Sequence, residues 1–286
     1  MGDHDLRTTL GAVPIERDVV EVRGPDAVAF LQGQLSQEVA DLAPGSSTWA
    51  LLLQPTGKVD AWLRTTRLAA DALSLDVEAG FGELVRARLA RFKLRTAAEL
   101  DLTRRSGYAV RGPGAATQVT GGLPAAWPGI EGVDLLAEDL DPSIPRVDRT
   151  ALDALRIECG VPLMGAEITE ATIPAELGQW LIDASVSFTK GCYTGQELVA
   201  RIDSRGGNVP RPVRGLLVAG DVAPDGSGVE RDGAEVGTVT SAGRSPTLGS
   251  IALAVVGRSV VGGTSVELRR PDGSVTAGVV AALPMR

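Results

Sequence analysis

Three segments of the chain place their apolar residues on one side of a helix. The first has its apolar residues at Ala27, Leu31, Leu35 and Val39, four residues apart. Segments 81–94 and 148–159 show the same one-sided pattern, which is typical of amphipathic helices packed on a core. Gly160 directly follows the third segment and is a common helix stop. We therefore predict helices over 81–94 and 148–159, and one that begins at Ala27 and ends at 42–45.

The helix predicted over 81–94 divides into an apolar and a basic side. Its apolar side comprises Leu84, Val85, Leu89 and Phe92. Its basic residues, Arg86, Arg88, Arg91 and Lys93, fall mostly elsewhere around the helix. Charged stripes of this kind are usually solvated surfaces. We expect the basic side to face solvent.

Strand-like runs fill the rest of the first half of the chain. Residues 49–53 form an apolar run, 54–57 form a turn with Pro and Gly, and 59–65 continue as the second arm of a hairpin. Shorter strands are predicted over 19–22 and 73–77. Segment 112–141 is rich in Gly, Pro and Ala and shows no regular period, so its topology stays open.

The pattern changes near residue 211. Short β-prone runs separated by Asp-Gly turns follow, at 213–219, 235–241, 250–256, 265–269 and 275–281. Five or six such strands in so short a segment predict a small closed antiparallel barrel. Gly and Pro cluster just before it, and we place a domain boundary between residues 205 and 206.

Composition and charge narrow the class of protein. The 286 residues suffice for two or three cores, and 44% hydrophobic with 22% charged residues is a globular composition. A formal charge of −8 opposes a polyanionic partner, so we expect no direct nucleic acid binding. No apolar run approaches the length needed to span a bilayer, and the N-terminal residues lack a secretory apolar stretch. We expect a cytoplasmic protein without membrane contact.

Soft metal ligands are scarce. The chain has two cysteines, Cys159 and Cys192, and one histidine, His4. These are too few for a disulfide framework or for a metal centre held by one chain. We expect two free thiols and no permanently bound metal.

The segment K-G-C-Y-T-G-Q-E, residues 190–197, carries the strongest candidate chemistry. Thr194 and Glu197 have the spacing of a capping box, which predicts a helix beginning at Thr194 with Cys192 just before its N-terminus. The helix dipole, and Lys190 if its side chain turns the same way, would favour a thiolate. The alternative is that Cys192 is a small packing residue, as expected for Cys159 on the apolar side of its helix.

These residues resemble the signature K-G-C-Y-x-G-Q-E of the YgfZ family, which is related to the glycine-cleavage T-protein. Further segments support the resemblance: F-L-Q-G-Q-L-S at 30–36, the hairpin at 51–60, L-R-I-E-C-G at 155–160, T-I-P-A-E at 172–176 and G-T-V-T-S at 237–241. The chain departs from T-proteins at three points. Their aspartate pair is Asp60-Ala61 here, their arginine before D-x-L-R is Leu152, and their G-Y-T-G-E segment has no match.

The resemblance implies an α+β fold, with two interleaved α+β domains over 1–205 around a central cavity and an antiparallel β-barrel over 206–286. It implies that the cavity binds tetrahydrofolate or a derivative, with contacts from Gln34, Asp60, Arg156 and Glu158. It gives Cys192 and Lys190 the chemical role, supported by Gly191, Tyr193, Thr194, Gly195, Gln196, Glu197 and Arg201.

The function implied is support for iron–sulfur cluster assembly or repair in client enzymes, through client or assembly proteins as partners, with an indirect effect on tRNA modification. Two alternatives stay open. The first is a folate-dependent aminomethyl or other one-carbon transferase, and the second is a folate-sensing scaffold without chemistry. The departures from the T-protein pattern at residues 60–61 and at Leu152 disfavour aminomethyl transfer.

Overall fold

The structure is a computed structural model that describes residues 4–204 and 209–285. Within these residues the chain forms a seven-stranded antiparallel sheet and a closed barrel of six strands. The sheet strands are β1 (Gly11–Arg23), β2 (Ser47–Leu53), β3 (Val59–Ala69), β4 (Ala72–Glu78), β5 (Glu99–Arg111), β6 (Leu123–Pro124) and β7 (Gly132–Leu135). The helices are α1 (Ala27–Gln34), α2 (Gly82–Phe92), α3 (Ala115–Gln118), α4 (Arg149–Cys159), α5 (Gln179–Ser185) and α6 (Gln196–Ser204), with a short 3-10 helix over Pro174–Leu177. The α+β class is confirmed.

Two long strands form the centre of the sheet. β1 pairs with β5 along its whole length, from Gly11 opposite Arg111 to Arg23 opposite Glu99. The strand predicted over 19–22 is therefore much longer, and β5 was missed. Many β5 side chains between Glu99 and Ser106 are exposed, so the strand lacks the apolar signal that marks a buried one.

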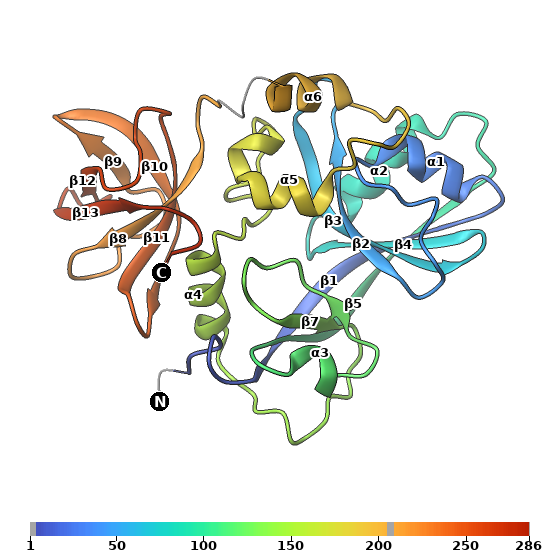
Figure 1. The fold of residues 1–286 in the computed structure, drawn as a ribbon, viewed down its shortest axis with the longest axis horizontal. Coiled ribbons are helices and arrows are strands. Elements are labelled where there is room, and N and C mark those ends of the chain that lie inside the picture. Colours follow the sequence, from blue (N-terminus) through green and yellow to red (C-terminus); the bar gives the residue numbers. More distant parts are fainter. Residues whose placement is uncertain (1–3, 205–208, 286) are drawn as a thin grey trace.

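The sheet is curled so that its two ends approach each other. β2 and β6 stand at opposite ends of the strand order β2-β3-β4-β1-β5-β7-β6. Even so, the indole nitrogen of Trp49 on β2 donates a hydrogen bond to the carbonyl of Pro124 on β6 at 3.2 Å. Strand twist favours such curling, and the curl leaves a concave face toward α4 (Figure 1).

The helix that begins at Ala27 is shorter than predicted. It ends at Gln34, and Leu35 is already extended and forms a bridge with Leu52. Leu35 and Val39 are fully buried all the same. The four-residue spacing therefore indicates burial in a common core. Beyond the end of α1, irregular chain rather than helix places Leu35 and Val39 there.

The other two predicted helices are confirmed, but one residue predicted on the apolar side of α2 is exposed. In α2, Val85 and Leu89 are buried, whereas Leu84 is 43% exposed. α4 ends at Gly160, whose left-handed φ of 71° is a conformation that glycine adopts without strain.

The predicted C-terminal barrel is confirmed. It comprises β8 (Val213–Val218), β9 (Gly228–Arg231), β10 (Ala234–Ser245), β11 (Gly249–Val256), β12 (Ser265–Arg269) and β13 (Val275–Ala281). β9 was not among the predicted runs and closes the barrel between β10 and β12. The predicted boundary between residues 205 and 206 lies outside the described residues.

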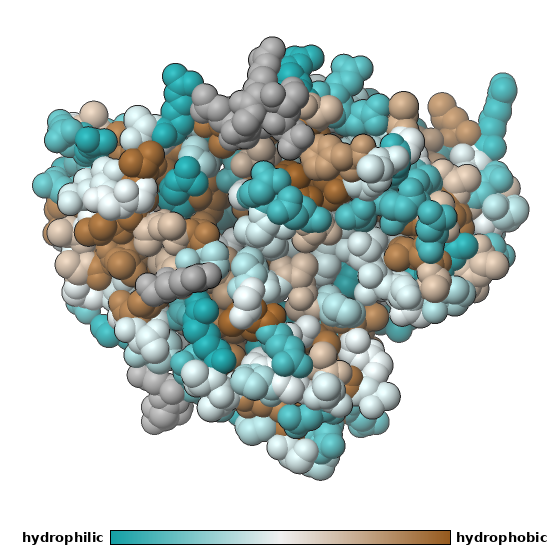
Figure 2. Space-filling view, viewed as in Figure 1, coloured by the Kyte–Doolittle hydropathy of each residue, from teal (hydrophilic) through white to brown (hydrophobic). Residues whose placement is uncertain are grey.

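Apolar side chains occur on both faces of one barrel strand. Val280 of β13 points into the barrel, whereas Val275 and Val279 are exposed. Figure 2 shows apolar side chains gathered on part of the barrel surface. Because alternation is weak here, the register of β13 depends on its pairing with β8 and β12.

α4 lies between the sheet and the barrel (Figure 1), and a buried carboxylate joins them. The Glu167 side chain is fully buried. Its Oε1 accepts hydrogen bonds from Thr240 Oγ1 at 2.6 Å and Ser241 Oγ at 2.7 Å, both on β10. Its Oε2 accepts from the amide of Leu163 at 2.9 Å and lies 3.5 Å from an Arg156 nitrogen.

No helix in the described part of the chain is long and apolar enough to cross a membrane.

We predict that Glu167→Ala lowers the free energy of unfolding by about 3–5 kcal/mol, because it leaves the buried Arg156 guanidinium without its carboxylate and the Ser241 hydroxyl without its acceptor. Glu167→Gln should cost less, since it keeps one carbonyl acceptor. Urea unfolding followed by circular dichroism measures both. Glu267→Ala, at an exposed site on β12, is the matched control and should change stability little. Equal losses in Glu167→Ala and the control would contradict this role.

Candidate functional site

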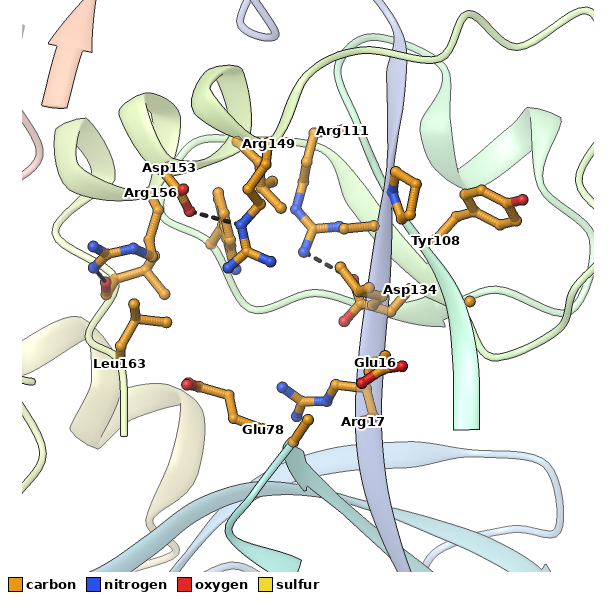
Figure 3. Close-up of a pocket in the computed structure, with 18 of the residues that line it drawn as sticks. Glu16, Arg17, Glu78, Tyr108, Arg111, Asp134, Arg149, Asp153, Arg156 and Leu163 are labelled. Carbon is orange, nitrogen blue, oxygen red and sulfur yellow. Dashed lines mark hydrogen bonds and ion pairs between the residues drawn. The ribbon is translucent and has the colours of Figure 1, made fainter. Parts of the chain in front are cut away.

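The concave face of the sheet and α4 enclose a cavity of about 750 Å³. β1, β5, β7 and α4 supply most of its walls, and Figure 3 shows charged side chains from these elements pointing into it. Such a volume is typical of sites for small molecules and cofactors. The central cavity implied by the resemblance is therefore present.

Tryptophans form one wall of the cavity. The strand register pairs Leu51 with Trp62 and Trp49 with Arg64, so the two tryptophans are diagonal neighbours on one face of the hairpin. Their rings are stacked with centroids 4.2 Å apart, and Trp180 of α5 meets Trp62 edge-on at 5.9 Å. Trp49 and Trp62 line the cavity. Only a small part of each residue is exposed there, 8% of Trp49 and 5% of Trp62.

Behind this wall lies a buried network of charges. The guanidinium of Arg64 is fully buried and bonds to both oxygens of Asp76, at 2.9 and 3.0 Å, and to Asp134 at 3.0 Å. Arg111 pairs with the other oxygen of Asp134 at 2.8 Å. Burial alone would raise the pKa of Asp134, but Arg111 and Arg64 outweigh it and lower this pKa to about 2.

Two arginines of the cavity keep an open hydrogen-bond donor. The Nε atoms of Arg111 and Arg156 are buried and have no hydrogen-bond partner among the described residues. Arg156 also donates from Nη1 to the carbonyl of Val161 at 2.8 Å. Buried donors are nearly always paired, so these two nitrogens are candidate contacts for an anionic ligand.

Glu78 faces the same cavity from the opposite side (Figure 3). Burial raises the pKa of its carboxyl, and the charge of Arg17 opposes this effect. The cavity thus presents Arg111 and Arg156 on one side and Glu78 beside Arg17 on the other.

The four predicted folate contacts do not converge on this cavity. Arg156 lines it, whereas Gln34, Asp60 and Glu158 are not among its lining residues. Glu158 is buried on another side of α4, where it pairs with Arg7, and its carbonyl accepts the amide of Met285 at 2.7 Å.

Gln34 and Asp60 meet at a second cluster around Arg88. Arg88 Nε bonds to Asp60 at 3.0 Å, Nη2 to the carbonyl of Leu53 at 2.8 Å, and Nη1 to Gln34 at 3.4 Å. Its guanidinium also stacks 3.8 Å above the ring of Phe92. The prediction that Arg88 faces solvent is wrong, because its side chain is only 9% exposed.

Lys190 is turned toward α1. Its Nζ donates hydrogen bonds to the carbonyls of Gln32 at 2.7 Å and of Leu35 and Gln37 at 2.8 Å, around the C-terminal end of α1. All three ammonium protons are thereby used. Burial lowers the pKa of Lys190 to about 8, and Glu38 opposes this shift. Lys190 therefore anchors the loop that carries Cys192. The sequence had suggested instead that its charge could be directed at the thiol.

The predicted capping box is absent from the described hydrogen bonds. α6 begins at Gln196, and the side chain of Gln196 accepts the amide of Tyr193 at 3.1 Å. The amide of Thr194 donates to the carbonyl of Gly33 at 3.1 Å. Gly195 has φ 83°, and a Cβ there would lie 2.6 Å from the carbonyl oxygen of Gln54, so the turn requires glycine. These contacts place a turn between Cys192 and the helix N-terminus.

The two thiols differ as predicted in their surroundings. Cys192 is exposed and Cys159 is buried. Burial raises the pKa of Cys159 to about 12. A side chain at position 191 would have room, since a Cβ there would meet no atom of the described residues within 4 Å. Glu197 lies in the first turn of α6, and Arg201 is exposed in its last turn. The motif thus presents one thiol at the surface, on a loop packed against α1 and the β2–β3 turn.

Comparisons with known proteins agree with this architecture. Residues 211–285 match the glycine cleavage T-protein C-terminal barrel domain. An uncharacterized protein of Haemophilus influenzae is 30% identical over 190 residues, which span 66% of this chain and 67% of that protein. The tRNA-modifying protein YgfZ of Edwardsiella ictaluri is 28% identical over 66% of this chain and 65% of its own length. The chain belongs to the YgfZ family, which is related to the aminomethyltransferases.

The aminomethyltransferase relatives show how far the likeness extends. The enzyme of Thermotoga neapolitana is 36% identical over 133 residues, which span 46% of this chain and only 34% of that enzyme. The crystal structure of aminomethyltransferase T from Bartonella henselae covers 98% of this YgfZ-family chain and 87% of its own, with a TM-score of 0.77 and 25% identity. The fold is therefore that of the glycine-cleavage T-protein.

Sequence reasoning missed the aromatic wall and Arg88. Two of the four tryptophans of the chain stand in one predicted hairpin, and this concentration was the available signal for the wall. Positions 85, 88, 89 and 92 share one helical face, so the spacing already allowed Arg88 to lie beside the buried Val85 and Leu89. No local pattern in the sequence indicated its partner Asp60.

The buried network predicts a specific response to acid. A carboxyl whose folded pKa lies below its unfolded value stabilises the fold above the unfolded pKa, and loses that contribution as pH falls through the folded pKa. For Asp134 this window runs from 3.8 to about 2. We expect the stability difference between wild type and Asp134→Asn to shrink by about 2 kcal/mol between pH 4 and pH 2.

Urea unfolding at several pH values measures that difference. Asp71→Asn, at an exposed turn position, is the control and should differ little from wild type at each pH. A difference between wild type and Asp134→Asn that stays constant across the window would contradict the role assigned to Asp134.

Proposed function

We propose that this YgfZ-family chain binds tetrahydrofolate or a derivative in the central cavity and supports iron–sulfur cluster assembly or repair in client enzymes through Cys192. An effect on tRNA modification would be indirect, through a client. The observation that carries the folate part is one cavity that combines a stacked tryptophan wall with the open Nε donors of Arg111 and Arg156.

The residues of the cavity fit the chemistry of a folate. A pterin or aminobenzoate ring suits the wall of Trp49 and Trp62, and the glutamate carboxylates suit guanidinium donors. Glu78 is a suitable partner for the polar edge of a pterin. Of the four contacts implied by the resemblance, Arg156 is the one we retain as direct. We propose that Gln34 and Asp60 act instead through Arg88, by holding the β2–β3 hairpin.

The exposed thiol supports the iron–sulfur part. Thiolate is the usual protein ligand of iron–sulfur clusters, and Cys192 is accessible at the surface. One cysteine supplies too few ligands to hold a cluster permanently, so the cluster is cargo or substrate. A client or assembly protein must provide the remaining ligands. We propose a cytoplasmic protein whose partners are folate and such proteins, without direct nucleic acid binding.

A one-carbon transferase is the second candidate, and the likeness to aminomethyltransferase T over nearly the whole chain favours it. Asp60 is the remnant of the aspartate pair that the transferase pattern carries. Its carboxylate is already bound to Arg88 and lies outside the lining of the cavity. This arrangement supports a structural use of Asp60, and a scaffold without chemistry remains the third reading.

We predict that tetrahydrofolate binds the purified protein and that Arg156→Lys weakens binding about tenfold, because a charge-assisted hydrogen bond is lost. The lysine keeps a positive charge beside Glu167 but lacks the open Nε donor. Isothermal titration calorimetry measures the affinity. Arg258→Lys, at an exposed site of the barrel, is the matched control and should bind like wild type. No binding to wild type at millimolar ligand would refute the folate assignment.

The role of the thiol is tested in a strain that lacks this gene. We expect Cys192→Ser to fail to restore cluster occupancy in client enzymes, whereas Cys159→Ser and Asp60→Ala restore most of it. Electron paramagnetic resonance and client activity report occupancy, and immunoblotting verifies protein levels. Aminomethyl transfer with a lipoyl carrier in vitro, together with a dispensable Cys192, would establish the transferase. Restoration by both Cys192→Ser and Asp60→Ala would instead favour the scaffold.

A further inference from the structure

α5 packs against the aromatic wall of the cavity, and the loop that carries Cys192 follows it in the chain. Near its start, Trp180 packs edge-on against Trp62. At its end, Ser185 Oγ accepts a hydrogen bond from the indole nitrogen of Trp62 at 2.9 Å. One cavity-lining tryptophan therefore contacts both ends of this helix, and the chain reaches Cys192 seven residues after Ser185.

A second step leads from Ser185 to Ser36. Ser36 Oγ donates to the carbonyl of Ser185 at 2.6 Å and accepts the amide of Leu51 at 2.8 Å. The carbonyl of Ser36 in turn accepts the amide of Ser187 at 3.0 Å. Both Ser36 and Ser185 are fully buried. These bonds join α5 to the residues that follow α1.

A third step reaches the Cys192 loop. Ser187 Oγ accepts the amide of Lys190 at 3.2 Å. The ammonium of Lys190 binds the carbonyls of Leu35 and Gln37, the two residues that flank Ser36. The hydrogen-bonded chain thus runs from Trp62 through Ser185, Ser36 and Ser187 to Lys190, two residues before the thiol.

Burial gives this chain its mechanical consequence. Trp62, Ser36 and Ser185 are buried, so a donor that loses its partner there finds no water to replace it and these bonds tend to be made or broken together. The bonds of Ser187 and Lys190 are partly buried. Trp62 lines the cavity and its indole donates to Ser185, so a ligand in the cavity contacts the first residue of this chain of hydrogen bonds. The loop is then held in its anchored arrangement, and its excursions become rarer.

We infer that Ser185 and Ser36 are positioning residues that couple occupancy of the central cavity to the reactivity of the Cys192 thiol. The inference rests on the proposed function, since the ligand is the proposed folate. Binding slows the reaction of the thiol with an external reagent.

The test measures the rate of Cys192 alkylation by iodoacetamide, with and without saturating 5-formyltetrahydrofolate, a stable derivative of the proposed ligand. Mass spectrometry of peptides follows Cys192, and the buried Cys159 serves as the internal marker of intact folding. In wild type we expect the ligand to slow alkylation by about fivefold or more, the lower end of the usual range of coupling between sites.

Ser185→Ala removes the acceptor of the Trp62 indole without altering a residue that lines the cavity. We expect it to bind the ligand while its alkylation rate no longer responds. Ser250→Ala removes a comparably buried serine bond, from Oγ to the carbonyl of Gly220 at 2.6 Å, in the barrel. This control should keep the response of wild type.

Trp62→Phe is the second variant, because it deletes the indole donor and keeps an aromatic ring. The ligand should not slow Cys192 alkylation in Trp62→Phe. Adding Ser185→Ala should change the rate no further, as expected for two residues in one chain of hydrogen bonds. Each protein is assayed at its own saturating ligand concentration.

The outcomes separate the two proposals. A ligand that fails to bind wild type overturns the proposed folate function. A ligand that binds while the alkylation rate of wild type is unchanged or increased overturns the coupling alone. A full response in both Ser185→Ala and Trp62→Phe also overturns the coupling.

Discussion

The buried guanidinium of Arg64 joins two ends of the sheet that are far apart in strand order. From β3 it binds Asp76 on β4 and Asp134 on β7, and its Nη1 also donates to the carbonyls of Leu123 and Pro124 on β6 at 3.1 and 3.2 Å. A buried cation is tolerated only when carboxylates and carbonyls surround it. This requirement keeps the sheet curled, and the curl is what makes a cavity between the sheet and α4.

The wall of the cavity and its open donors follow from the same arrangement. Arg64 lies 5.3 Å from the ring of Trp49 and so supports the stacked tryptophans from behind. Asp134 engages Arg64 and Arg111 together, which holds Arg111 at the cavity while its Nε stays without a partner among the described residues. Charges that stabilise the fold thus also orient groups that a ligand can use.

Two anchors outside the cavity position the Cys192 loop. Lys190 ties the loop to the end of α1, and Arg88 ties the β2–β3 hairpin to α1 through Asp60 and Gln34. Gly195 packs against the carbonyl of Gln54 in the hairpin turn. Gln34 and Asp60, which the resemblance implies as folate contacts, are here bonded to Arg88.

The sequence by itself determined the local elements and the identity of the motif. Helices α2 and α4, the β2–β3 hairpin and the barrel were predictable because their apolar periods, turn residues and stop signals act within about twenty residues. The contrast between Cys159 and Cys192 was predictable for the same reason, since one lies on an apolar stripe and the other in a glycine-flanked loop.

The tertiary structure alone decided which charges meet. Arg88 finds Asp60 28 positions away, Arg64 finds Asp134 70 positions away, and Lys190 finds carbonyls more than 150 positions away. A charged residue carries no mark in the sequence of whether water or a distant carboxylate will solvate it. That choice is made only when the sheet curls and removes water from both groups, because burial then makes an unpaired charge too costly to persist.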